Sequence, residues 1–164
     1  MKNNTQNIPT AKYVCDSKTE RVEIVLFEHL NGFSRLFGGK LVEWIDIVAA
    51  VVARRHSNRN VTTASIDNLQ FKNGAYMNDT IVLQGTMTYV GNTSMEVKVN
   101  TFVERLDGTK QLINTAYIVL VALDEDDKPI PVPKLILTTD EEKAEWEAGI
   151  RRHELRKQRR IDKY

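Results

Sequence analysis

The stretch that decides the fold is LFGGKLVEWIDIVAAVVARR, residues 36–55. Nine of the ten residues at 44–53 are apolar, and the tenth is Asp46. Apolar residues recur along this stretch at the spacing of one helical face, and further apolar residues fill the other faces. The pattern predicts a helix over 39–56 that is buried nearly all round.

The segments on either side of this helix have the composition of β-strands. Residues 20–27 precede it, and four stretches rich in Val, Ile, Thr and Tyr follow it, at 61–71, 79–90, 94–106 and 111–123. Turn-forming residues separate the last three, which predicts an antiparallel meander. The last strand should be covered on both faces, whereas the alternating third strand should have one face in water. The order of elements indicates an α+β fold with one helix against an antiparallel sheet.

The two ends of the chain differ from this central domain, which we place at 15–137. Residues 1–14 are polar, and we expect them to be flexible. Three prolines within 124–135 oppose regular structure there. Within 138–164 a threonine stands three residues before a glutamate, acidic residues come first and basic residues last, which predicts a charged C-terminal helix. Its basic end is expected to be solvated or to pack against another subunit.

Composition and charge limit the classes of partner. The 164 residues are within the range of one domain, and the net charge of +1 gives no reason to expect a nucleic acid or an anionic membrane. Cys15 is the single cysteine, and the N-terminal segment lacks the apolar core of a signal peptide, so we expect a cytoplasmic protein. The three histidines lack metal-ligand spacing, and no metal site is predicted.

Asp46 is the exception within the apolar helix. A structural carboxylate would have a cation three or four residues away, but the positions at that spacing are Val42, Glu43, Ala49 and Ala50. An ionised carboxylate buried without a partner costs several kcal/mol. We therefore expect Asp46 to face a cleft, where a carboxylate can act as a general base.

Several blocks of sequence carry a resemblance to a known family. These are NGFSRLFGGKLVEWIDIVAAVVARRH, VTTASIDNLQF, YVGNTSMEV and NTAYIVLVALDEDDKPIPVP. In order and spacing they resemble the acyl-CoA thioesterases of the hotdog superfamily, in the cytosolic acyl-CoA hydrolase branch. The resemblance implies a long central helix wrapped by a curved antiparallel sheet, and hydrolysis of fatty acyl-CoA to a free fatty acid and CoA. It also implies a homo-oligomer, either a dimer or a trimer of dimers.

The resemblance assigns roles to four residues around the helix. It places the catalytic carboxylate on Asp46 and the catalytic asparagine, which orients the water or the thioester carbonyl, on Asn31. Gly38 and Gly39 lead into the helix, where unpaired backbone N–H groups could hold the developing negative charge. The two glycines could equally serve only to make the turn into the helix. The family has glycine where this chain has Ser34, so the loop conformation around Asn31 could differ.

The turn YVGNTSMEV resembles a segment that lies along the CoA path in the family, with Gly91, Thr93 and Ser94 matching. Asn92 replaces a frequent arginine there, and a simple hairpin turn explains the same residues equally well. CoA is part of the substrate and the product, so no separate cofactor is expected.

Two other functions remain open: a non-catalytic acyl-CoA sensor, and a hotdog hydratase or dehydratase acting on acyl thioesters. A hydratase needs a histidine beside an acid, and the predicted helix has only His56, at its far end. A Gly-x-Ser-x-Gly sequence is absent, so a serine nucleophile is not expected. Attack by water and attack by the Asp46 carboxylate through an anhydride stay as alternatives.

Overall fold

The computed structural model describes residues 9–163, apart from the side chain of Asn68. Its regular elements follow one another in the order that the sequence pattern predicts, with short additions near the N-terminus and before the last helix. They are β1 (Ala11–Tyr13), η1 (Val14–Asp16), β2 (Thr19–Ile24), η2 (Phe27–His29), α1 (Gly38–Ser57), β3 (Asn60–Phe71), β4 (Thr80–Val90), β5 (Ser94–Glu104), β6 (Lys110–Leu123), β7 (Lys134–Ile136) and α2 (Asp140–Ile161).

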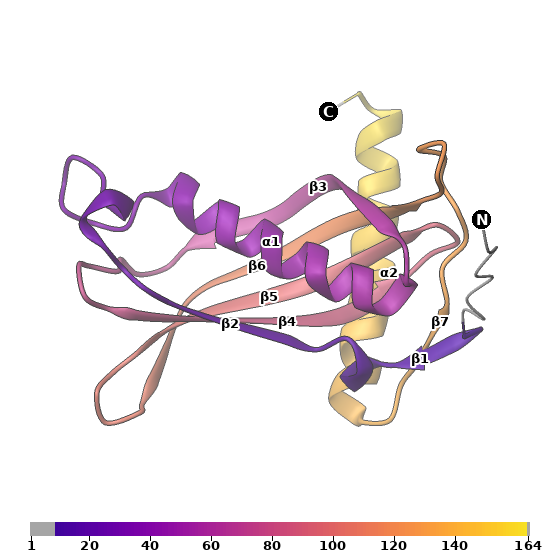
Figure 1. Cartoon of the computed structure of the whole chain (residues 1–164). Helices are drawn as coiled ribbons and strands as arrows, with labels where there is room; N and C mark the ends of the chain where they lie inside the picture. Colours follow the sequence, from indigo (N-terminus) through magenta and orange to yellow (C-terminus); the bar gives the residue numbers. More distant parts are fainter. Residues whose placement is uncertain (1–8, 164) are drawn as a thin grey trace, which may run out of the picture.

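Five strands form one curved antiparallel sheet in the order β2-β4-β5-β6-β3. The predicted meander of β4, β5 and β6 is confirmed, and β3 returns to pair with β6. Figure 1 shows α1 lying along one face of this sheet and α2 crossing behind the other face. The expected hotdog arrangement, a long helix wrapped by a curved sheet, is therefore present. β3 and β2 form the two edges of the sheet.

α1 is held against the sheet by an apolar face that is fully buried. Its buried side chains are Leu41, Trp44, Ile45, Val48, Ala49, Val52 and Ala53. Burial of each of the large ones stabilises the fold by about 1.5–3 kcal/mol. Gly85 of β4 permits the close approach, because a Cβ there would lie 2.7 Å from Val48 Cγ1. The helix ends after Ser57, where Asn58 adopts a left-handed conformation with φ 54°.

The expectation that α1 is buried all round is wrong. Glu43, Ile47 and Arg54 are exposed along one stripe, and Ile47 keeps 41% of its surface accessible. The physical reason is that a single curved sheet covers only one side of a helix. The apolar residues on the other side of α1 are left for a second layer, which a single chain does not supply.

The expectation of a water-exposed face on the strand predicted at 94–106, which is β5 and the middle strand of the meander, is also wrong. α2 covers the outer face of β5, where Glu96 is 1% exposed. Thr88 Oγ1 donates to Glu96 Oε1 at 2.8 Å, Arg152 Nη2 donates to the same oxygen at 2.8 Å, and Arg156 Nη1 donates to Oε2 at 2.7 Å. The alternating pattern of β5 is correct, but ion pairs with α2 replace water around its polar residues.

Apolar contacts bring α2 close to β4 at the same place. Gly149 is buried on the face of α2 that meets Tyr89, and a Cβ at Gly149 would lie 2.7 Å from Tyr89 Cβ. The ring of Trp146 packs on the ring of Tyr89 with 4.8 Å between centroids. α2 begins after Thr139, whose hydroxyl accepts from the backbone N–H of Glu142 as in the expected capping box. The capping box fixes the start of α2, and the contacts of Trp146 and Gly149 with Tyr89 fix its middle to the sheet.

The segments that were expected to lack regular structure form a short parallel pair. β1 lies within residues 1–14 and pairs with β7, which starts directly after Pro133, the last of the three prolines. Lys134 N donates to Thr10 O, so the pairing begins at the edge of the described chain. Residues 1–8 lie outside the described residues, and their expected flexibility stays a prediction.

We predict that Glu96→Gln lowers the free energy of unfolding at pH 7 by about 3–5 kcal/mol, because two partly buried guanidinium groups lose their carboxylate. Burial acts to raise the pKa of Glu96, but the hydrogen bonds from Arg152, Arg156 and Thr88 outweigh it and hold the pKa below its ordinary value. A lowered folded-state pKa gives stability that is present above the unfolded value of about 4.3 and is lost as pH falls through the folded value.

Urea unfolding of both proteins between pH 7 and pH 3 measures this difference. The difference in the free energy of unfolding between wild type and Glu96→Gln should become smaller below a pH of about 4. Glu147→Gln, an exposed carboxylate of the same helix, is the control and should show no gap. A gap that does not depend on pH would contradict the role given to the ionised Glu96.

Candidate active site

Asp46 lies on the side of α1 that turns toward β3, and it is half-buried. Thr63 Oγ1 donates a hydrogen bond to Asp46 Oδ1 at 2.7 Å. The sequence offers Asp46 no cation within one helical turn, and the structure shows that its partner comes from the strand after the helix. One oxygen of the carboxylate is held in place, and the other is available to a ligand or a water molecule.

Thr63 is the residue that the sequence analysis missed. It is exposed and lies at a bulge in the pairing of β3 with β6, where Thr63 pairs with Leu120 and Ser65 already pairs with Val119. A bulge places one extra residue, here Ala64, in the strand and changes the direction of the neighbouring side chains. The only signal in the sequence is the alternation that puts Val61 and Thr63 on one face of a strand following a helix.

Asn31 organises the loop between η2 and α1. Its side-chain Oδ1 accepts from the backbone N–H groups of Phe33 at 2.9 Å and Arg35 at 3.2 Å. Its own backbone N–H donates to Arg35 O at 2.8 Å. Within residues 9–163 no group accepts a hydrogen bond from its Nδ2, so this amide keeps two donors for a ligand.

The departure at Ser34 has a conformational consequence. Ser34 has φ 57°, which is the left-handed region that costs a residue with a Cβ about 1–2 kcal/mol and costs glycine nothing. Ser34 N donates to Asn31 O at 3.0 Å, so the loop keeps its turn in spite of this cost. The serine therefore strains the loop without opening it.

The N-terminus of α1 presents unpaired backbone donors. Phe37 is the N-cap residue, and its side chain makes no capping hydrogen bond. Its backbone carbonyl accepts from Lys40 N and Leu41 N. Gly38 N and Gly39 N donate to no described group. A Cβ on Gly39 would lie 2.5 Å from Phe37 Cε1, so the aromatic ring rests on this glycine. These two N–H groups, at the positive end of the helix dipole, suit a negatively charged oxygen.

A cleft of about 320 Å³ joins two of the predicted site residues. Asn31 and Gly38 line it, together with Phe71 at the end of β3. Asp46 does not line this cleft, because it lies eight residues further along α1, which corresponds to about 12 Å along the helix axis. Within one chain, therefore, the structure brings Asn31 and the helix N-terminus together and leaves Asp46 with Thr63 apart from them.

The turn predicted to contact CoA lines a larger cavity. Gly91, Thr93 and Ser94 border a space of about 760 Å³ between the sheet and α2. A Cβ on Gly91 would lie 2.8 Å from Ser94 Oγ, which explains the glycine without reference to a ligand. The cavity also reaches Ala64 and Ser65, the residues that follow Thr63 in β3.

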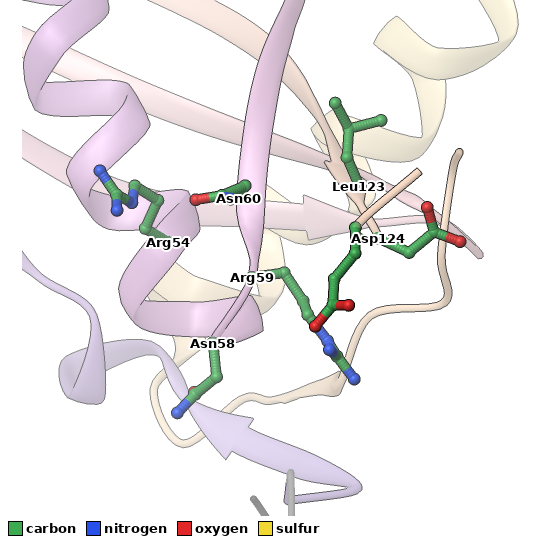
Figure 2. Close-up of a pocket in the computed structure, with 7 residues that line it drawn as sticks. Arg54, Asn58, Arg59, Asn60, Leu123 and Asp124 are labelled. Atoms are coloured by element: carbon green, nitrogen blue, oxygen red, sulfur yellow. The ribbon is translucent and has the colours of Figure 1, made fainter. Parts of the chain in front are cut away.

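A third cavity, of about 370 Å³, lies at the C-terminal end of α1 and contains none of the predicted site residues (Figure 2). Figure 2 shows the side chains of Arg54 and Asn60 on one side of it and that of Arg59 on the other. Acidic Asp124 also lines this cavity. The mixed charges give the cavity no clear preference for an anion or a cation.

The histidines are used in packing. His56 is fully buried, and burial lowers its pKa, so the neutral ring donates from Nε2 to Pro133 O at 2.9 Å. His29 packs edge-on against Trp44, and its Nδ1 accepts from Leu26 N at 3.1 Å. Neither ring contacts Asp46, and the carboxylate nearest to His29 is that of Glu28, with 3.6 Å between Nε2 and Oε1.

Residues 9–163 contain neither a metal-binding cluster nor a membrane-spanning helix. No group of three or more His, Cys, Asp or Glu side chains is placed to hold a metal ion. Neither described helix combines the length and apolar character that crossing a bilayer requires.

Comparison with known proteins gives matches over most of the chain. A model of the thioesterase superfamily matches residues 33–107. The acyl-CoA thioester hydrolase YkhA of Bacillus subtilis is 35% identical over 153 residues, which are 93% of this chain and 89% of that protein. The cytosolic acyl coenzyme A thioester hydrolase of Rattus norvegicus is 34% identical over 73% of this chain. The match spans only 32% of the rat protein's own length.

Solved structures agree with these relatives. A hexameric acyl-CoA thioesterase in its apo form is 39% identical, with a TM-score of 0.88 over 92% of this chain and 97% of that one. An acyl-CoA hydrolase from Staphylococcus aureus, 32% identical with a TM-score of 0.88 over 93% of this chain and 94% of that one, was solved with butyryl-CoA, CoA and CoA disulfide. Variants of that hydrolase in which a threonine, an aspartate or an asparagine is replaced by alanine have also been solved.

We predict that Ser34→Gly raises the free energy of unfolding by up to about 1 kcal/mol. Relief of the left-handed strain exceeds the added chain entropy of glycine in the unfolded state. Ser34→Ala keeps the strain and is the matched control, which should show no gain. Thermal unfolding of the three proteins compares them. A loss of stability in Ser34→Gly would show that the serine side chain contributes more than its conformation costs.

Proposed function

The chain belongs to the acyl-CoA thioesterases of the thioesterase superfamily, and we propose that it hydrolyses fatty acyl-CoA to a free fatty acid and CoA. The hydrogen-bonded pair of Asp46 on α1 and Thr63 on the edge strand β3 is the observation that carries this proposal. A carboxylate held by one oxygen beside an accessible surface is arranged to accept a proton from water.

The relatives give independent support for the choice of residues. In the Staphylococcus aureus hydrolase the three substituted positions, an asparagine, an aspartate and a threonine, are separated by 15 and then 17 residues. Asn31, Asp46 and Thr63 have the same residue types in the same order, separated by 15 and 17 residues. The match includes Thr63, which was identified here from its hydrogen bond to Asp46 alone.

The proposed mechanism divides the reaction between these groups. Asp46 accepts a proton from the attacking water, and Thr63 fixes the carboxylate so that its free oxygen points at that water. The N–H groups of Gly38 and Gly39 bind the carbonyl oxygen as negative charge develops on it, and the free Nδ2 of Asn31 orients the same carbonyl or the water. Attack by Asp46 itself, through an anhydride, uses the same groups and remains the alternative route.

We propose further that each site is built from two chains. A general base and the donors for the oxyanion must all lie within about 3–4 Å of one thioester, whereas Gly38 and Asp46 of one chain are about 12 Å apart. Asp46 is hydrogen-bonded to Thr63 of the edge strand β3, and Ile47 beside it is exposed. Antiparallel pairing with a second copy would bring the partner's helix N-terminus toward this carboxylate.

The same comparison supports a proposal for the oligomeric state and the location. The hexameric thioesterase with 39% identity supports an assembly of dimers for this chain, as the sequence analysis expects. The cytosolic enzymes of rat, mouse and human support the expected cytoplasmic location. The length of the acyl chain is not part of the proposal.

We predict that Asp46→Asn keeps the fold and lowers kcat by about 100-fold or more, the low end for a positioned general base. Release of free thiol from a series of acyl-CoA substrates, together with circular dichroism, measures activity and folding. Glu43→Gln, an exposed carboxylate one turn earlier on α1, is the matched control and should keep kcat. A folded Asp46→Asn protein with nearly normal turnover would refute the assignment and favour a sensor.

We predict that Asn31→Ala and Asp46→Asn, each inactive alone, complement each other. A mixed dimer would contain one site with both substitutions and one site with neither. Co-refolding at a one-to-one ratio should therefore restore about a quarter of wild-type activity if mixing is random. Mixed dimers demonstrated by native mass spectrometry, but without recovered activity, would show that each chain builds its own site.

A further inference from the structure

The edge of the sheet opposite β3 exposes apolar side chains. β2 forms this edge, since it pairs with β4 and stands last in the strand order. Val22 and Ile24 on β2, and Leu26 and Phe27 directly after it, are all exposed, with 82% of Phe27 accessible. Single exposed apolar residues are ordinary on a protein surface, but a cluster of them marks a site of interaction.

The loop between β3 and β4 extends this cluster. Asn78 N donates to Val25 O at 2.9 Å, so the loop lies against the end of β2. The loop exposes Tyr76 and Met77. Arg35, in the loop before α1, forms a β-bridge with Tyr76. Figure 1 shows both loops at the end of the molecule where α1 begins, away from α2.

The loop before α1 links this cluster to the candidate active site. Phe33 is 86% exposed, and its backbone N–H donates to Asn31 Oδ1 at 2.9 Å. Ser34, the next residue, has the left-handed conformation described above. A contact that held the Phe33 ring would therefore restrain the backbone that orients the Asn31 amide. We define the apolar surface as the exposed side chains of Val22, Ile24, Leu26, Phe27, Phe33, Tyr76 and Met77.

The apolar surface has the area of a protein interface and little charge. With roughly 150–200 Å² for each fully exposed side chain of this size, it offers on the order of 700 Å². Each partner in a standard protein–protein interface buries about 800 Å². The charged side chains within residues 25–37 and 75–79 are Glu28, Arg35 and Asp79, which are two carboxylates against one guanidinium group. An anionic lipid surface attracts basic segments, so the apolar surface suits a protein partner instead.

A second dimer of this chain is the partner that the proposed assembly requires. Pairing through β3 relates two copies by a two-fold axis and closes on itself, so it gives a dimer and nothing larger. An assembly of dimers therefore needs another contact surface on each chain. β2 is the sheet edge that pairing through β3 leaves free, and the apolar surface begins there.

We propose that the apolar surface docks against a second dimer of this chain, and that this contact, through Phe33, holds Asn31 in its catalytic orientation. This inference rests on the proposed function and the proposed two-chain site. Phe33 is then a positioning residue, because it acts on the thioester only through Asn31. Loss of the contact lowers kcat and leaves KM nearly unchanged, because the other substrate contacts remain.

The decisive experiment removes two exposed rings, in Phe27→Ser/Phe33→Ser. Sedimentation velocity should show the wild type as an assembly of dimers and the double variant as a single dimer. The reason is that each aromatic anchor in an interface changes the dissociation constant by roughly 30-fold or more. Phe27→Leu/Phe33→Leu keeps the apolar surface and should restore the assembly. Leu155→Ser/Ile161→Ser removes two exposed apolar side chains of α2 and should leave the assembly intact.

Kinetics on the same proteins test the link to Asn31. For Phe27→Ser/Phe33→Ser we expect kcat for an acyl-CoA to fall by about tenfold or more, since a displacement of about 1 Å can cost about 100-fold. KM should stay within about twofold. The leucine variant should recover kcat together with the assembly, which a purely local effect of the serines on the loop would not predict. A wild type without hydrolysis would overturn only the proposed function, because sedimentation still reports the contact.

Four results would overturn the proposal. A serine double variant that keeps the wild-type assembly would show that the rings make no contact between dimers. Its dissociation into monomers would assign the rings to the pairing through β3. Binding of the wild type to vesicles of phosphatidylcholine and phosphatidylglycerol, lost in the double variant, would assign the surface to lipid. A dimeric double variant with the kcat of the wild type would remove the link between the contact and Asn31.

Discussion

The packing of one face of α1 against the curved sheet is the interaction on which the other features depend. Val48 and Val52 approach β4 closely enough that Gly85 must have no side chain. This contact fixes the rotation of the helix about its axis, and it thereby turns Asp46 toward β3, where Thr63 can reach it. It also places the N-terminus of α1 beside Asn31 and the end of β3. The packing of the apolar core therefore determines where the candidate catalytic groups lie.

The same packing leaves a surface that one chain cannot cover. A sheet buries one side of a helix, so Ile47 and its neighbours on the opposite side remain accessible. β3 is an edge of the sheet, with backbone groups free to pair on its outer side. Both surfaces adjoin the separated halves of the proposed site. In the proposed two-chain site, the pairing that covers the apolar stripe would also bring the oxyanion donors to the carboxylate.

α2 covers the second face of the sheet, and ion pairs hold it there. The Glu96 carboxylate accepts hydrogen bonds from Thr88 of β4 and from Arg152 and Arg156 of α2. The free-energy cost of removing this carboxylate from water is offset only because the two arginines complete its hydrogen bonds. Gly149 brings α2 close to Tyr89, which places the helix firmly on the strand. Arg156 belongs to this network, and the arginines that follow it on the helix are held beside the turn at 91–94. The ion pairs of Arg156 with Glu96 and Asp67 therefore help to set where α2 lies on the sheet.

The sequence by itself determined the element order, the antiparallel meander and the start of α1, because periodicity and turn residues are local properties of the chain. It also singled out Asp46, since a carboxylate among nine apolar residues is visible without a structure. Through the family resemblance it predicted Asn31 and the two glycines. Ser34 was noted as a departure, and the structure supplies its meaning in the positive φ of that residue.

Only the tertiary structure decided which polar groups are partners. Thr63 meets Asp46, and Arg152 and Arg156 meet Glu96, across separations of 17, 56 and 60 residues. Such contacts depend on how elements pack, and no local pattern encodes them. For that reason the predictions for the polar face of β5 and for the surface of α1 were wrong. An alternating strand does not reveal which element will cover its polar face. An apolar helix does not reveal how many layers one chain can place around it.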